Sequence, residues 1–151
     1  MAGKTTVFAA DFLKLIFNGT TIPNIARDVD PATGSPLTSL FLSLHTSDPG
    51  RTPANGQLTN ELQYNGGGQR VGVVRSASGW TVTNDAVSPA AVVNFPEKTS
   101  GDGGSANWVG VGTSQSGAGK LLWSGQLTPP IVVTANGTVP SIKTSSTITE
   151  T

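Results

Sequence analysis

The chain has 151 residues, with nine basic and nine acidic side chains and no net charge. This length gives room for one domain with a single core, and the neutral balance argues against a nucleic-acid partner, because phosphate binding needs a clustered basic surface. Cys is absent and there is a single His, so disulfides and thiolate metal sites are excluded. The 19 Gly and 10 Pro favour many short strands joined by turns.

The first predicted element is a helix over residues 6–17. Apolar side chains recur there at spacings of one, three and four, with Asp11 and Lys14 on the other side. A threonine can cap its start, and Gly19 stands where a left-handed residue ends a helix. A helix this short and apolar is not stable alone in water. We expect it to pack on the chain's own sheet, and docking on another subunit is the alternative.

A polar connector over residues 20–37 follows the helix. It is rich in Pro and Gly, and it holds the only close pair of acids, Asp28 and Asp30. Turn formation and capping explain this pair better than catalysis does, although a weak Ca²⁺ site in such a loop stays an alternative.

The clearest strand pattern covers Leu37–Thr46. Leu40, Leu42 and Leu44 alternate with Ser43 and His45, which predicts a strand with one buried face. His45 falls on the less apolar face, next to a turn-forming Ser-Asp-Pro-Gly sequence. We expect His45 to be a hydrogen-bonded or exposed strand residue and not a general base.

Further short strands follow a long Gly-rich loop over residues 51–69, at spacings near ten residues. They are predicted at Gln69–Ser76, Trp80–Thr83, Ala90–Phe95, Ala106–Thr113, Lys120–Ser124, Pro130–Thr134 and within Val139–Thr149. The total of about eight strands predicts a mainly β fold: a jelly-roll-like β-sandwich with one short N-terminal α-helix. We expect residues 1–19 to form that helix and residues 20–151 a single β-sandwich domain.

The sequence contains no complete catalytic motif. Gly117–Lys120 resembles the end of a phosphate-binding loop, but Leu121 stands where Ser or Thr is needed and a strand follows instead of a helix. No Gly-x-Ser-x-Gly sequence is present, and the acids are scattered, which argues against a cell-wall hydrolase. Trp80, Trp108 and Trp123 fit core or interface packing better than sugar stacking. The sequence therefore predicts no catalytic residue, no cofactor and no metal site.

Three sequence blocks together resemble a known family. They are LSLHTSDPG at Leu42–Gly50, WVGVG at Trp108–Gly112 and LLWSG at Leu121–Gly125. With the N-terminal helix, they make nearly the whole chain similar to small virion proteins of tailed bacteriophages, which are labelled tail fibre proteins or, in some phages, capsid decoration (cement) proteins. The resemblance implies a β-sandwich that binds the phage particle without catalysis.

The predicted function is that of a decoration protein that binds the outside of the capsid and stabilises it, because no coiled-coil or repetitive shaft is present. Its partners would be the major capsid protein and copies of itself. The alternative is a tail or neck fibre component, used in adsorption or in anchoring a fibre, with tail or neck proteins as partners. Neither reading involves nucleic acid or a membrane, and both imply a virion protein assembled in the host cytoplasm.

The residues expected to contact a partner come from the helix and from the long loop. They are Phe8, Phe12, Leu15 and Ile16 on the apolar helix, and Arg51 and Arg70 at the two ends of the loop.

Overall fold

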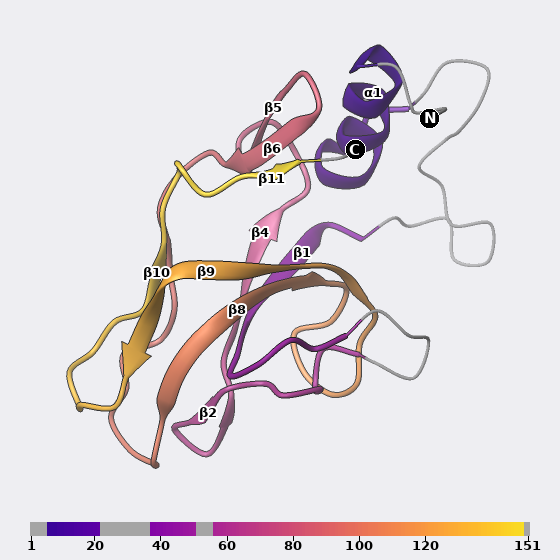
Figure 1. Ribbon diagram of the computed structural model, residues 1–151. Coiled ribbons are helices and arrows are strands. Elements are labelled where there is room, and N and C mark those ends of the chain that lie inside the picture. The colour runs from indigo at the N-terminus through magenta and orange to yellow at the C-terminus, as the bar shows by residue number, and fades with distance from the viewer. Residues whose placement is uncertain (1–5, 22–36, 51–55, 150–151) are drawn as a thin grey trace. The chain divides into compact units, whose positions relative to one another are not determined.

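The computed structural model describes residues 6–21, 37–50 and 56–149, which form one helix and eleven strands (Figure 1). The elements are α1 (Thr6–Asn18), β1 (Ser39–His45), β2 (Gln63–Tyr64), β3 (Gly67–Gly68), β4 (Arg70–Val74), β5 (Trp80–Thr83), β6 (Ala86–Pro89), β7 (Val93–Asn94), β8 (Gly104–Gly112), β9 (Leu121–Val133), β10 (Ser141–Ile142) and β11 (Ile148–Thr149). The predicted class, mainly β with one short helix, is confirmed. The strands exceed the predicted eight because β2, β3 and β6 lie in segments assigned to loops.

The strands form four sheets. The largest has the order β4-β1-β8-β9, the next has the order β11-β6-β5, and two pairs, β10-β7 and β2-β3, complete the set. The pairings of β1 with β8, β8 with β9 and β5 with β6 are antiparallel. Several antiparallel sheets and one short helix agree with the predicted β-sandwich, and its jelly-roll connectivity stays a prediction.

Contacts divide the chain into two compact units that alternate along the sequence. The first unit takes the described parts of residues 1–39, 73–92 and 142–151, and the second takes those of residues 40–72 and 93–141. The division into a helix over residues 1–19 and one domain over residues 20–151 stays a prediction.

The first unit is built around the packing of α1 on β5 and β6, which Figure 1 shows side by side. Leu13 and Phe17 project from the inner face of the helix and are completely buried. The Phe17 ring meets Trp80 edge-on, with ring centroids 4.7 Å apart. The expectation that the helix packs on the chain's own sheet is therefore confirmed. No helix in the described ranges is long and apolar enough to cross a lipid bilayer.

Arg75, which lies outside the helix, caps the C-terminal end of α1. The last turn of α1 has no basic residue of its own. The Arg75 guanidinium instead donates to the carbonyls of Leu15 (2.8 Å) and Ile16, and to that of Leu37 at 2.9 Å. Gly19 adopts the predicted left-handed conformation, with φ 65°. One cation thus satisfies carbonyls that the helix end leaves without partners.

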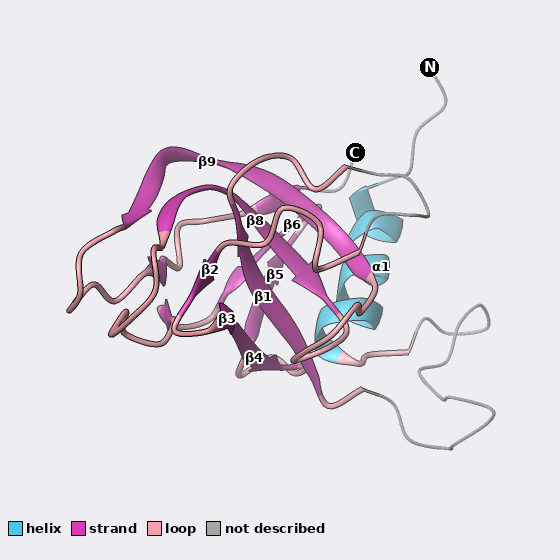
Figure 2. Ribbon diagram, turned by 90° about the horizontal axis from the view of Figure 1, so that it is seen from below, coloured by secondary structure: helices cyan, strands magenta, loops and turns pink. Residues whose placement is uncertain are grey.

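The second unit is built on β1, β8 and β9, which lie side by side in Figure 2. The leucines of β1 are buried on one face as predicted, but Ser43 and His45 on the other face are also fully buried. The prediction of one buried face was therefore wrong. The reason is that the segment over residues 56–62 covers the second face: the Gln57 side chain lies over Gly112 of β8, and the Thr59 carbonyl accepts a bond from His45 Nδ1 at 2.8 Å. The same segment pairs with the end of β1 through Thr46 N to Asn60 O and Leu62 N to Leu44 O, both 2.8 Å.

β9 joins two predicted strands into one. The sequence pattern predicts separate strands at Lys120–Ser124 and Pro130–Thr134. Prolines in the interior of a strand are usually not tolerated. β9 lies at the edge of its sheet, where Pro129 and Pro130 are tolerated, and they fall in an irregular stretch between the pairs Trp108–Gln126 and Ala106–Ile131.

Replacing Arg75 by Met should lower the free energy of unfolding by about 2 kcal/mol, because the charged hydrogen bonds to the end of α1 are lost while the aliphatic stem remains. Urea denaturation followed by circular dichroism measures the change. Lys143→Met is the matched control, since it removes an exposed cation of the same unit. Equal midpoints for the two variants would contradict the capping role.

Candidate functional site

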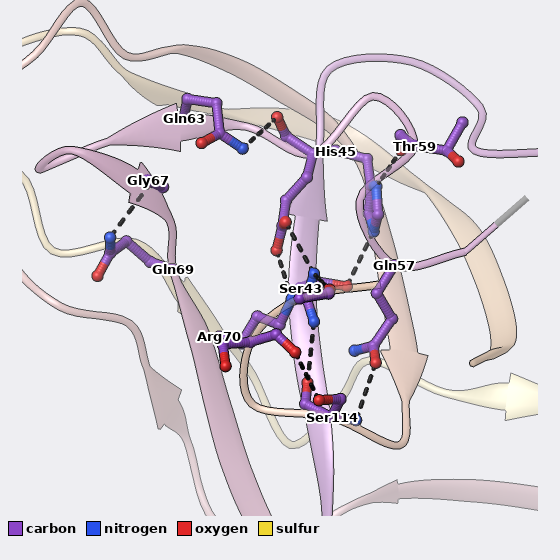
Figure 3. A network of polar contacts seen from close by, with 12 residues as sticks. Ser43, His45, Gln57, Thr59, Gln63, Gly67, Gln69, Arg70 and Ser114 are labelled. Atoms are coloured by element: carbon purple, nitrogen blue, oxygen red, sulfur yellow. Dashed lines mark hydrogen bonds and ion pairs between the residues drawn. The ribbon is translucent and has the colours of Figure 1, made fainter. Parts of the chain in front are cut away.

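A cluster of buried polar side chains stands out in the second unit. It consists of Ser43 and His45 on β1, Gln57 and Glu61 in the covering segment, and Arg70 at the start of β4. All five are less than one-tenth exposed. Figure 3 shows Ser43, His45, Gln57 and Arg70 converging beside Ser114, in the turn between β8 and β9. Glu61 joins them through its contact with Arg70. We call this set the loop clamp, because its hydrogen bonds end on two loops.

The Arg70–Glu61 ion pair is the centre of the loop clamp. Arg70 Nε donates to Glu61 Oε1 at 2.6 Å, and Arg70 Nη2 donates to Glu61 Oε2 at 2.9 Å. The other bonds of the guanidinium run to the carbonyls of Ser114 (3.0 Å) and Gly117 (2.9 Å). The planar guanidinium can bind the carboxylate and the turn at the same time, because it offers five N–H donors in fixed directions.

Gln57 holds the same turn from a second direction. Its side-chain Oε1 accepts a bond from Ser114 N at 2.9 Å, and its backbone N donates to Ala118 O at 3.1 Å. A Cβ at Gly112 or Gly119 would lie 2.1 or 2.2 Å from Gln57 side-chain atoms, so both glycines make room for the amide. The β8–β9 turn is thus fixed by two side chains, while residues 115–118 at its tip are exposed.

His45 ties the covering segment to β1. Its Nδ1 donates to the Thr59 carbonyl at 2.8 Å, so Nε2 of the neutral ring is free to accept from Ser43 Oγ, also 2.8 Å away. Burial lowers the pKa of His45 below its ordinary 6.5, and this outweighs the bond to Thr59 and the carboxylate of Glu61, both of which raise it. The imidazole is therefore neutral near pH 7.

The Ser43–His45 pair has the hydrogen bond of a hydrolase dyad, but it lacks the access to substrate and the carboxylate partner that catalysis needs. Both side chains are fully buried, and a backbone carbonyl holds Nδ1 where a triad has a carboxylate. Across the described ranges, no three His, Cys, Asp or Glu side chains gather to hold a metal ion. The chemistry of the loop clamp is hydrogen bonding that fixes loops, and the predicted structural role of His45 is confirmed.

The residues predicted to contact partners are distributed over both units. Phe12, Leu15 and Ile16 are half-buried on α1 in the first unit, whereas Arg70 in the second unit points inward to Glu61. The Phe8 side chain and Arg51 lie outside the described residues, as do Asp28 and Asp30. Their role in partner contacts stays a prediction.

The tryptophans divide between core and partly exposed positions. Trp80 is buried against Phe17, whereas Trp108 and Trp123 are half-buried on β8 and β9.

Sequence reasoning missed Gln57 and Glu61 because both lie in a segment assigned to a loop. One signal was present in the alternating glycines of β8. A Cβ at Gly110 would lie 2.7 Å from His45 Nε2, and one at Gly68 would lie 2.2 Å from the Glu61 carboxylate carbon. Small residues opposite polar ones mark a packed polar layer, but the pairing of Ser43 with Gly110 becomes evident only in the folded sheet.

Comparison with known proteins finds one family. A family model described as Podophage GP4 fiber I protein gp80 matches residues 5–149, nearly the whole chain. No curated protein matches the chain.

The neutral, buried His45 predicts a specific pH dependence of stability. The unfolded chain takes up a proton at the ordinary pKa of 6.5 and the folded chain resists it, so acid favours unfolding. The contribution of His45 is complete above pH 6.5 and is lost as the pH falls below it, with a slope of at most about 1.4 kcal/mol per pH unit. Urea denaturation between pH 7.5 and 5.5, about one unit either side of that pKa, measures it.

The single His makes the assignment direct. In proton NMR the imidazole of the folded chain should titrate well below pH 6.5, and in urea it should titrate near its ordinary value. A His45→Gln variant should show a flatter stability profile. An ordinary titration in the folded chain would contradict the buried, neutral ring.

Arg70→Met should destabilise the second unit by about 3–5 kcal/mol, because it leaves the Glu61 carboxylate buried without its partner. The double variant Arg70→Met/Glu61→Leu should recover part of this loss, since no uncompensated charge remains. Urea denaturation of Arg70→Met, of Glu61→Leu and of the double variant gives the coupling energy between the two side chains. Additive effects of the two substitutions would show that the ion pair is not the centre of the loop clamp.

Proposed function

The chain belongs to the family of Podophage GP4 fiber I protein gp80, and from this premise we propose that it is a small, non-enzymatic component of a phage fibre. The membership makes it a structural protein of the phage virion. The finer assignment, a fibre or neck component that anchors a fibre or takes part in adsorption, is supported by the description of the family as a fibre protein.

The family description favours the fibre reading over capsid decoration. We expected decoration first because the chain has no shaft of coiled-coil or repeated β elements. A small module without a shaft also suits the attachment end of a fibre, where a folded domain binds another protein. The experiment therefore has to distinguish a fibre component from a protein that stabilises the capsid shell.

The loop clamp supports a binding role without catalysis. Its only nucleophile–imidazole pair is buried and neutral, and its charged pair is satisfied by internal partners. What it leaves at the surface is the fixed turn at residues 115–118. A loop held in one conformation loses little entropy on binding, and this suits repeated contacts in a particle.

We propose tail or neck proteins and further copies of the chain as partners, with assembly in the host cytoplasm. The half-buried side of α1, with Phe12, Leu15 and Ile16, is the apolar surface predicted for these contacts.

Copy number per particle tests this function. In purified virions, quantitative mass spectrometry should give a few to a few tens of copies, in a simple ratio to a tail or neck protein. Antibody labelling in electron micrographs should fall on the tail. Hundreds of copies in a simple ratio to the major shell protein, with label over the head, would overturn the fibre assignment in favour of capsid decoration.

A further inference from the structure

Lys98 is a buried cation of the second unit that has no acidic partner. It lies between β7 and β8 and is 3% exposed. Within the described residues, no carboxylate lies in ion-pair range of its ammonium group, and its side chain makes one hydrogen bond, from Nζ to Asn136 Oδ1 at 2.8 Å. Arg70, which is also buried in this unit, has the carboxylate of Glu61 instead. A neutral amide thus stands where a buried cation usually has a carboxylate.

Backbone hydrogen bonds hold Asn136 beside Lys98. Lys98 N donates to Thr138 O, and Gly137 N donates to Lys98 O, both at 2.8 Å. Gly103 makes room for the lysine, because a Cβ there would lie 2.9 Å from Lys98 Cε. Asn136 itself, in the loop between β9 and β10, is exposed. It therefore contacts a buried ammonium group while it remains open to water.

Gly137 gives Asn136 the neighbour with which an asparagine loses its amide group most readily. The backbone nitrogen that follows an asparagine can attack the side-chain carbonyl carbon, and a residue without a side chain does not hinder this attack. Gly137 has φ 86°, and a Cβ built there meets no atom within 4 Å. We propose that Asn136 is a deamidation site, and that the carboxylate formed there binds the ammonium group of Lys98.

The reaction needs water and no other reactant. The nitrogen of Gly137 forms a bond to Cγ of Asn136, the bond from Cγ to Nδ2 breaks, and ammonia leaves with the proton that Gly137 gives up. Water then opens the cyclic imide at Cγ, which gives aspartate, or at the main-chain carbonyl, which gives isoaspartate. Negative charge develops on Oδ1 during the attack, and the ammonium group of Lys98 already binds this oxygen and stabilises the charge.

Asn65, which is also followed by a glycine, has a side chain that hydrogen bonds hold in place. Its Oδ1 accepts from Thr99 N at 2.7 Å and from Ser100 N at 3.0 Å, and its Nδ2 donates to Glu97 O at 2.7 Å. All of these bonds oppose rotation of the amide toward the backbone nitrogen that would attack it.

The side-chain amide of Asn136 is held less firmly. The bond from Lys98 goes to Oδ1, which stays on the side chain through the reaction, and within the described residues Nδ2 has no partner. Gly137 N has to leave Lys98 O before it can attack, and this opening takes place in an exposed loop. The structure thus favours reaction at Asn136 over reaction at Asn65.

Deamidation strengthens the contact between the loop that contains Asn136 and the segment that contains Lys98. A carboxylate accepts a charge-assisted hydrogen bond from the ammonium group, which is stronger than the bond to a neutral amide. Loss of ammonia is irreversible in dilute solution. The chain therefore carries a one-way chemical change that stabilises its second unit without an enzyme.

Peptide mapping by mass spectrometry tests the site in the purified full chain, kept folded in mildly alkaline buffer. Asn136 should deamidate, and Asn65 should react at least about tenfold more slowly, because its hydrogen bonds must open first. In urea, where this protection is lost, the two asparagines should react at similar rates. An Asn136 that keeps its amide in the folded chain, or that reacts no faster than Asn65, would overturn the proposal.

The pairing with Lys98 has its own test, in which Asn136→Asp represents the aspartate product. This substitution should raise the folding equilibrium constant, measured by urea denaturation, by about fivefold, because an ion pair replaces a neutral contact. In a Lys98→Met background it should give no gain. Gln115→Glu, the same amide-to-acid change at an exposed position of the second unit, is the matched control and should leave the constant unchanged.

No gain from Asn136→Asp, or an equal gain with and without Lys98, would contradict the pairing. Neither experiment uses virions, so both outcomes are independent of the fibre assignment.

Discussion

The buried ion pair between Arg70 and Glu61 is the constraint on which the second unit depends. Removing two charges from water costs several kcal/mol per ion, and the pair is tolerable in the interior because both carboxylate oxygens and the guanidinium donors have partners. Two of those partners are carbonyls of the β8–β9 turn. The covering segment, the start of β4 and this turn are therefore fixed together, although they lie far apart in the sequence.

Glycines make this polar layer possible. Gly68 leaves space for the Glu61 carboxylate, Gly110 for the His45 ring and Gly112 for the Gln57 amide. A methyl group at any of these positions would meet a buried polar atom closer than van der Waals contact allows. The sheet thus accepts polar side chains where a sandwich usually packs aliphatic ones. The hydrogen bonds of this layer fix the orientation of its side chains, and the three glycines cannot be replaced by larger residues without a clash.

The buried charged side chains of Arg70 and Glu61 are paired in the interior of the second unit, and they are not available to a partner protein. β9 at the edge of the sheet carries no charged residue. Binding to a partner protein needs a surface with a defined conformation. The exposed tip of the clamped turn, residues 115–118, is a feature of the second unit that offers such a surface.

Sequence alone determined the parts of this protein that depend on local pattern. The period of the apolar residues located α1, the alternation of leucines located β1, and Gly19 marked the end of the helix, because each of these signals lies within one element. The three sequence blocks also pointed to the phage virion family. Only the tertiary structure decided that Ser43 and His45 are buried, that Arg70 meets Glu61 and that Pro129 and Pro130 lie within an edge strand. Those outcomes depend on which segments pair and cover one another, and pairing between distant segments is set by packing that no local pattern records.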